Sequence, residues 1–334
     1  MTSSPPRRLG FFTRVLDRAT PAERYRLAVE QIRHAESCGY ASAWIAQHHF
    51  HEDEGGLPAP FVFLAQAAAR TSAIRLGTGI VTLPLELPIR VAEDAAVLDL
   101  MCGGRLEVGI GPGGNHSAFA AFGLDSAERG PLMVRHRRLM LDAWTGLELP
   151  GGDRLYPQAP SLAERMWQAT FTVEGARRAG TDGDGLLLSR TQPRPADAPH
   201  LTLAEIQEPM IDAYLAALPQ GRSPRILASR SVFVADDLDR ARALAIAGYT
   251  LHRNRLLEIG RTVAGETVED LIAASDVHWG TPEMVVDTLQ ADATLARATD
   301  LAVQVHSIDP PHEFTLRSLE LMADKVAPAI GWRA

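Results

Sequence analysis

The chain has 334 residues, of which 46% are hydrophobic and 22% charged, and its formal net charge is −8. That composition is typical of a globular protein with a large core. The negative charge argues against nucleic acid and against an anionic membrane surface as partners, because both favour basic proteins. The two cysteines, Cys38 and Cys102, have no metal-ligand spacing. With no signal peptide or apolar span visible in the sequence, we expect a cytoplasmic protein.

Short apolar runs alternate with helix-like segments along the whole chain. The expected strands are residues 9–12, 40–46, 74–79, 106–111, 165–168, 185–188, 226–234 and 301–305. Strands that alternate with helices form parallel sheets with right-handed crossovers. Eight of them predict an α/β fold of the (β/α)8 TIM-barrel type, as one domain over residues 1–334, with insertions after strands 4, 6 and 7. A doubly wound open sheet is the alternative, which the strand count disfavours.

The expected helices cover residues 59–71, 89–101, 127–145, 173–180, 203–218 and 314–326, after a first helix that begins at Thr20-Pro21. Threonine at the N-cap and proline at the first helical position are typical of a helix start. Residues 238–298 are expected to be mostly helical.

The segment that follows the second strand contains three histidines. In barrels of this type ligands bind at the carboxyl ends of the strands, so His48, His49 and His51 are candidates for metal or acid–base chemistry. Adjacent strand residues point to opposite faces, so His48 and His49 are not expected to share a metal ion. We predict no metal site, structural roles for His49 and His51, and a catalytic role for His48.

Glycines mark the ends of the third and fourth strands. Residues 77–80 (GTGI) either relieve crowding or let a planar ligand lie against bare backbone. Residues 109–115 (GIGPGGN) lack the last glycine of the dinucleotide fingerprint, yet their N–H groups can bind phosphate. After the fifth strand, Thr172 either only caps the next helix or helps to form an anion site there.

Taken together and in their order along the chain, these segments resemble the corresponding segments of the bacterial luciferase-like flavin monooxygenases. AQHHFHEDEGG resembles the family's EHHF segment, and residues 74–114 resemble the block around its third and fourth strands. FAAFGLD and HWGTPEMVVDTLQ resemble later blocks, so the resemblance covers nearly the whole chain. It implies the same barrel and the oxidation of a small organic molecule by O2 and reduced FMN, which a separate flavin reductase supplies.

The resemblance also implies site residues. His48 matches the histidine that assists catalysis near the flavin, and Gly79 and Ile80 would lie against the flavin ring, joined by a cis peptide bond as in the family. The further cofactor-binding residues that we predict, for the ring or the phosphate, are Gly111, Gly113, Gly114, Gln168, Ala169, Thr170 and Thr172.

Two positions depart from the family pattern. Gln47 replaces the glutamate before the histidine pair, which removes a negative charge there. Pro112 stands where luciferase has a phosphate-binding arginine, and proline offers neither charge nor donor. Arg190, directly after the sixth strand, is the best replacement, since an arginine fork can bind two phosphate oxygens. The alternative is that Arg190 pairs with Asp182 or Asp184 and never meets a ligand.

Three functions remain open at this point. The first is the FMN-dependent monooxygenase, and the second is a deazaflavin-dependent oxidoreductase of the same fold that transfers hydride without oxygen. The third is a non-catalytic flavin-binding or partner subunit. The expected helices at residues 59–71 and 89–101 carry few charges, which together with the resemblance predicts a homodimer. No motif in the sequence identifies the organic substrate.

Overall fold

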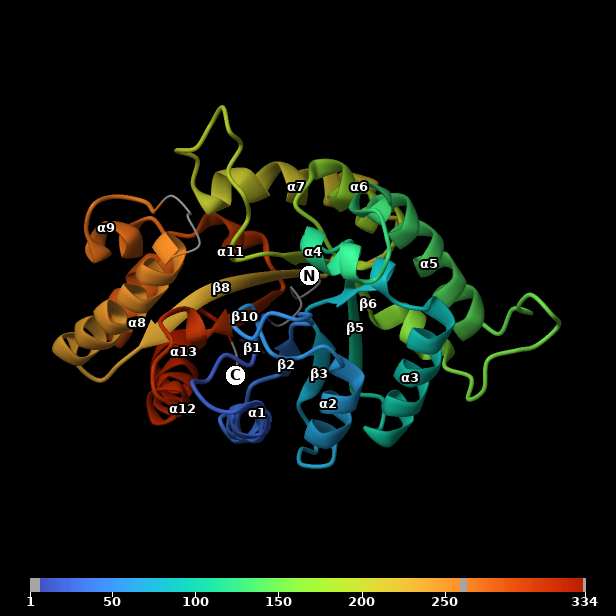
Figure 1. Ribbon diagram of the computed structural model, residues 1–334, viewed down its shortest axis with the longest axis horizontal. Helices are drawn as coiled ribbons and strands as arrows, with labels where there is room; N and C mark the ends of the chain where they lie inside the picture. The colour runs from blue at the N-terminus through green and yellow to red at the C-terminus, as the bar shows by residue number, and fades with distance from the viewer. Residues whose placement is uncertain (1–6, 259–262, 333–334) are drawn as a thin grey trace.

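A closed barrel of parallel strands lies at the centre of the computed structural model, which describes residues 7–258 and 263–332 (Figure 1). Around the barrel the strands are β1 (Arg8–Thr13), β2 (Ser42–Ile45), β3 (Arg75–Thr78), β5 (Leu106–Gly111), β6 (Met166–Ala169), β7 (Gly185–Leu188), β8 (Ile226–Val234) and β10 (Asp300–Gln304). β10 pairs with both β8 and β1, which closes the sheet. The predicted (β/α)8 barrel is confirmed.

Helices cover the outside of the barrel. They include α1 (Pro21–Ser37), α2 (Pro60–Ala68), α3 (Pro88–Met101), α5 (Arg129–Trp144), α6 (Val173–Thr181), α7 (Leu203–Ala217), α8 (Leu238–Glu258), α10 (Pro282–Gln290) and α12 (His312–Leu321). The threonine caps act as expected: Thr20 accepts from the N–H of Glu23, and Thr172 from that of Gly175. After α12 the chain continues through a π-helical turn, η5 (Met322–Val326), into α13 (Ala327–Ala329).

The long connections follow β5, β7 and β8, as the sequence predicts. The first contains α4 (His116–Ala121), which was not predicted, and the last contains α9 (Val268–Ala273) and α11 (Ala293–Arg297). Figure 1 shows α8 and α9 at one end of the long axis and α3 and α5 at the other. None of the helices in the described ranges is long and apolar enough to cross a membrane.

Two short strands lie outside the barrel. β4 (Val81–Thr82) pairs with β5, and β9 (Val277–Gly280) pairs with residues 231–234 of β8. The interpretation of residues 238–298 as mostly helical missed β9. A four-residue strand is too short to show a period of its own, and it forms because the nine-residue β8 extends beyond the barrel and offers a free edge.

Two tryptophans fill the barrel interior. Trp44 on β2 and Trp167 on β6 are 2% and 1% exposed, and their rings meet edge to face with 5.5 Å between centroids. A Cβ on Gly77 would lie 2.3 Å from the Trp44 ring, and one on Gly185 would lie 2.1 Å from the Trp167 ring. Glycine at both positions therefore provides the space that the rings occupy.

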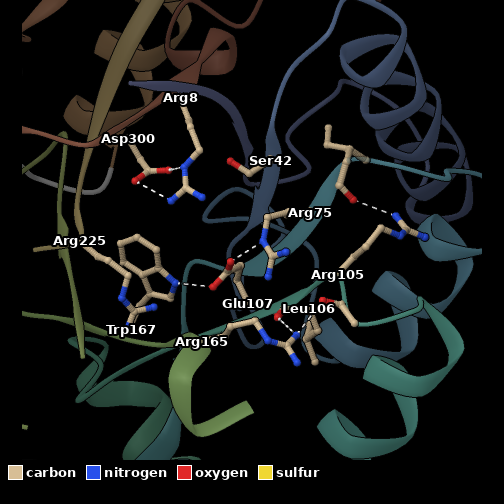
Figure 2. Close-up of polar contacts among 12 residues, drawn as sticks. Arg8, Ser42, Arg75, Arg105, Leu106, Glu107, Arg165, Trp167, Arg225 and Asp300 are labelled. Carbon is tan, nitrogen blue, oxygen red and sulfur yellow. Dashed lines mark hydrogen bonds and ion pairs between the residues drawn. The ribbon is translucent and has the colours of Figure 1, made fainter. Parts of the chain in front are cut away.

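Charged side chains close the end of the barrel at which the strands begin (Figure 2). The carboxylate of Glu107 pairs with Arg75 at 2.5 Å and accepts a hydrogen bond of 2.7 Å from the indole nitrogen of Trp167. The guanidinium of Arg225 lies over the Trp167 ring, 4.9 Å from its centroid. Because Glu107 is buried, these partners compensate for its lost hydration and hold Trp167 in one orientation.

We expect Gly185→Ala to lower the free energy of unfolding by about 1–3 kcal/mol, because the new Cβ displaces the Trp167 ring in a close-packed interior. Urea unfolding followed by tryptophan fluorescence measures the change. Gly130→Ala in α5 is the matched control, since a Cβ there meets no atom within 4 Å and alanine favours the helix. Equal stability of the two variants would show that the barrel relaxes around the added methyl group.

Candidate active site

A cavity of about 700 Å³ opens at the carboxyl ends of the barrel strands. That volume is in the usual range for cofactor and ligand pockets. The ends of β2, β3, β5 and β6 contribute its walls. Eight of the predicted site residues line it: His48, Gly79, Ile80, Gly111, Gly113, Gly114, Ala169 and Thr170. The structure thus brings together residues from four separate segments of the sequence.

Two glycines and Ile80 form one wall of this cavity. The peptide bond between Gly79 and Ile80 is cis, as predicted. A Cβ on Gly111 would lie 2.6 Å from Cδ1 of Ile80, and one on Gly79 would lie 2.9 Å from the Phe12 ring. Glycine at positions 79 and 111 therefore provides the space that the side chains of Phe12 and Ile80 occupy, and this packing fixes Ile80 in the wall of the cavity.

The other end of the cavity offers neutral hydrogen-bonding groups. The Thr170 hydroxyl accepts from the N–H of Thr172 at 3.1 Å, and the Thr172 hydroxyl caps α6 at 3.0 Å from the Gly175 nitrogen. Thr172 itself does not line the cavity. The described lining contains no arginine or lysine, in agreement with proline at position 112. A phosphate in this cavity would therefore meet uncharged donors.

The Gln168 side chain faces away from the cavity. Its amide nitrogen donates to Asp182 at 2.7 Å and to Asp184 at 2.8 Å, and both carboxylates also pair with Arg137. Side chains alternate along a strand, so Trp167 points into the barrel and Gln168 points outward. The side chain that was predicted to bind phosphate is therefore engaged in a network outside the barrel.

Arg190 lines two neighbouring cavities, of about 650 and 330 Å³, and not the one described above. Its Nε donates to Oε1 of Gln304 at 2.8 Å and a terminal nitrogen donates to the Ser231 hydroxyl at 3.1 Å. These bonds hold it at the ends of β8 and β10. The alternative pairing with Asp182 or Asp184 does not occur, because both acids pair with Arg137 at 3.2 and 2.7 Å.

His48 lines both the 700 and the 330 Å³ cavity. Its side chain is 28% exposed, and Nδ1 lies 3.9 Å from a carboxylate oxygen of Glu54. Burial lowers the pKa of His48 to about 3, and the positive charges of Arg14 and Arg190 act in the same direction. The imidazole is therefore neutral near pH 7, able to donate or accept a hydrogen bond but not to act as an imidazolium acid.

Gln47 fixes the turn that carries His48. Its amide nitrogen donates to Glu86 at 2.7 Å and to the carbonyl of Pro58 at 3.0 Å, while its oxygen accepts from the N–H of Thr82 at 2.7 Å. The side chain of Gln47 is thus held by three hydrogen bonds, one of them to the carboxylate of Glu86.

The other two histidines of the segment make local contacts. His51 Nε2 lies 3.2 Å from the Ser117 hydroxyl, and the His49 ring packs edge-on against Phe122 at 5.0 Å. These contacts agree with the structural roles expected for both. In the part of the chain that the structure describes, no group of three or more His, Cys, Asp or Glu side chains could hold a metal ion.

Of the arginines around the 650 Å³ cavity, sequence reasoning found Arg190 and missed the others. Arg14 directly follows β1, so the strand-end rule that found His48 could have found it too. Tyr249, His252 and Arg255 also line this cavity, but they come from α8. A helical segment with mixed composition carries no local sign that one face borders a cavity.

Residues 9–299 match the family model described as luciferase-like monooxygenase. The chain belongs to this family. It is 30% identical over 310 residues to 4-hydroxyprotoasukamycin monooxygenase of Streptomyces nodosus subsp. asukaensis, covering 87% of this chain and 82% of that protein. It is also 30% identical over 319 residues to limonene 1,2-monooxygenase of Rhodococcus erythropolis, covering 90% and 80%. This luciferase-like protein is accordingly an enzyme of the monooxygenase class.

Solved structures share the fold at lower identity. The oxygenating constituent of 3,6-diketocamphane monooxygenase from Pseudomonas putida, in complex with FMN, superposes with a TM-score of 0.78 at 19% identity, covering 97% of this chain and 98% of that one. The coenzyme F420-dependent tetrahydromethanopterin reductase from Methanopyrus kandleri does so with a TM-score of 0.69 at 17% identity, covering 97% and 99%. One barrel therefore serves two kinds of cofactor.

The pKa of His48 predicts a pH dependence of stability. The unfolded chain has a histidine pKa of about 6.5 and the folded state one of about 3, so unfolding takes up a proton between these values. We expect the free energy of unfolding to fall as the pH is lowered from about 6.5 towards 3, and His48→Gln to reduce that slope. Urea titrations at several pH values measure it, with the exposed His200→Gln as control. Identical slopes in wild type and His48→Gln would contradict the assignment.

Proposed function

We propose that this protein is the oxygenase component of a two-component FMN-dependent monooxygenase. It would take reduced FMN from a separate flavin reductase and use O2 to oxidise a small organic substrate. The observation that supports this best is the 700 Å³ cavity at the strand ends, where a wall formed by Gly79, Ile80 and Gly111 adjoins His48. FMN as the particular flavin, and the reductase as partner, are parts of the proposal.

When bound, reduced flavin supplies the electrons with which O2 is activated. The residues of this chain would bind the flavin and orient it. The main chain of Gly79, Ile80 and Gly111 would hold the ring, while the Thr170 hydroxyl and the N–H groups of Gly113 and Gly114 would face the phosphate. Because these donors are uncharged, they favour weak binding, which suits a flavin that is exchanged with a reductase at every turnover.

His48 would act as a neutral hydrogen-bonding group. It borders two cavities, so its ring can hold or accept a proton at a group placed between flavin and substrate. Gly55 has a positive φ of +127°, and a Cβ there would lie 3.0 Å from Cδ2 of His48, so the turn packs closely against the imidazole. The ring is thereby held in one position, as a catalytic or positioning group requires.

The deazaflavin-dependent reaction is the second candidate, favoured by the likeness in fold to an F420-dependent reductase. Trp44 lines the 330 Å³ cavity beside Ile80, and Trp167 contacts Trp44, so a bound ring should quench their fluorescence. Titration with FMN and with a deazaflavin shows which cofactor binds more tightly. The third possibility, a non-catalytic subunit, predicts binding without turnover.

The decisive measurement is substrate-dependent O2 uptake with FMN, NADH and a flavin reductase, across a panel of organic substrates. We expect turnover in the wild type and a loss of roughly 10²- to 10³-fold in His48→Ala, the usual cost of removing one oriented hydrogen-bond donor from an active site. His49→Ala removes the neighbouring imidazole, which lines the same cavity, and should act mainly on local packing. Near-normal turnover of a folded His48→Ala variant would refute the catalytic assignment.

We also propose a homodimer formed through α2 and α3. These helices pack against each other, and exposed apolar side chains gather on them. Val62 is 75% exposed, Leu87 73%, Leu100 64% and Met101 64%. Apolar surface of this kind is typical of an interface between subunits.

Light scattering at micromolar concentration should therefore give the mass of two chains. Leu100→Glu should shift the protein towards the monomer, because it places a charge in the buried interface. Leu215→Glu on α7, a half-exposed position on another helix, is the control and should leave the mass unchanged. A monomeric wild type would refute the dimer.

A further inference from the structure

The 650 Å³ cavity beside the proposed flavin site is rich in arginine. It lies between the ends of β1 and β7 and the helix α8. Four acidic residues also line it, so the sum of formal charges is positive. The arginines are Arg14, Arg18, Arg24, Arg190, Arg194 and Arg255, and the acids are Asp53, Glu54, Asp276 and Asp309.

Three of these arginines are neutralised by partners within the cavity wall. Arg18 pairs with Asp309 at 2.7 Å, Arg194 with Asp276 at 2.6 Å, and Arg255 with Asp53. Arg24 is turned towards main-chain carbonyls, donating to that of Ala19 at 3.2 Å and to that of Glu52 at 2.5 Å. Among the described residues, Arg14, Arg24 and Arg190 thus have no carboxylate partner, and of these three Arg14 and Arg190 also line the neighbouring 330 Å³ cavity.

Arg14 and Arg190 donate to uncharged oxygen atoms. Arg14 donates to the carbonyl of Glu54, and Arg190 to the side chains of Gln304 and Ser231. Within the described ranges, neither guanidinium has a carboxylate within the 4.0 Å of an ion pair. The Glu54 carboxylate accepts instead from Asn115 at 2.8 Å. The charge of Glu54 still acts on Arg14, whose pKa it raises against the larger lowering effect of burial. Among the described residues, neither of these two partly buried cations forms an ion pair, which is costly unless an anion binds there.

The electrostatics of the neighbouring groups support this reading. Burial lowers the pKa of Arg190 to about 9, and the charge of Arg14 acts in the same direction. Both cations also contribute to the lowered pKa values of His48 and His252, after burial as the main cause. Arg190 nevertheless stays protonated near pH 7, so the cavity keeps its positive charge at neutral pH.

The positions of Arg14 and Arg190 indicate what kind of ligand they bind. Both also line the 330 Å³ cavity, which contains Ile80 and His48 and joins the proposed flavin site. They therefore stand at the boundary between flavin and the larger cavity. Apolar side chains complete the larger cavity, among them those of Leu16, Leu251 and Leu256. The surroundings suit a molecule with an anionic head and an apolar body.

We infer that the substrate of this enzyme is an organic acid whose carboxylate is bound between Arg14 and Arg190, with its apolar part in the 650 Å³ cavity. This inference rests on the proposed function, in that the occupant is taken to be the substrate. It also gives Arg190 a role other than the flavin phosphate ligand expected from the sequence. Arg190 does not line the flavin cavity, whose proposed phosphate end is formed by Gly111–Gly114 and Thr170.

The test uses the full chain without flavin and three probes, benzoate, 4-phenylbutyrate and decanoate, each compared with its uncharged primary amide by isothermal titration calorimetry. We expect at least one acid to bind roughly 10-fold or more tightly than its amide. Arg190→Gln should weaken that acid roughly 10- to 100-fold, the contribution of a charge-assisted hydrogen bond, and leave the amide nearly unchanged. Arg190→Lys should restore part of the affinity, since it keeps the charge.

Two controls exclude indirect effects. Arg138→Gln removes the same charge from an exposed site on α5 and should bind like the wild type. Arg14→Gln provides an independent test of the pair, should the variant at position 190 fail to fold. The inference is overturned if no acid binds more tightly than its amide, or if both Arg190→Gln and Arg14→Gln weaken acid and amide equally.

Flavin binding separates this inference from the proposed function. FMN and riboflavin differ by the phosphate, so the ratio of their affinities reports on a phosphate ligand. We expect Arg190→Gln to leave that ratio unchanged. If the variant loses FMN affinity selectively while its affinity for the acids stays normal, Arg190 binds the cofactor phosphate and the inference is wrong. If the wild type binds acids but no flavin, the proposed function fails and the acid site stands.

Discussion

The contact between Trp44 and Trp167 fills the barrel interior and therefore determines where ligands can bind. The two rings occupy the space that Gly77 and Gly185 leave open, and they fill the interior from one wall to the other. The Trp44 ring forms part of the floor of the 330 Å³ cavity. With the interior filled in this way, the cavities next to the barrel interior open at the carboxyl ends of the strands.

Glu107 connects this floor to the opposite end of the barrel. It holds the Trp167 indole by a hydrogen bond and is itself neutralised by Arg75, as Figure 2 shows. A buried carboxylate is stable only with such partners, so the orientation of the ring depends on charges that never meet a ligand. The ion pair at the end where the strands begin thus fixes the orientation of Trp167, which packs against Trp44 in the floor of the site.

The cavities above the floor differ in charge, and this difference suggests a division of roles. The cavity lined by Gly111 and Thr170 offers uncharged donors, whereas the cavity lined by Arg14 and Arg190 carries positive charge. His48 stands near both, kept neutral by burial and by the two arginines. A neutral imidazole between a flat cofactor and a charged anchor can orient reactants without adding a further charge.

The barrel and the segments that form the site could be predicted from the order of residues along the chain. Apolar runs alternating with capped helices specify the strand order, and in a parallel barrel that order brings every strand end to one face, so His48, Gly79, Gly111 and Thr170 could be grouped in advance. The contacts of each side chain, in contrast, depend on how the segments pack in three dimensions. Gln168 bonds outward to two aspartates, and β9 forms on the edge that β8 extends beyond the barrel. The charge of the second cavity depends on which arginines find carboxylates among residues far away in the chain, and local sequence patterns do not record such long-range pairing.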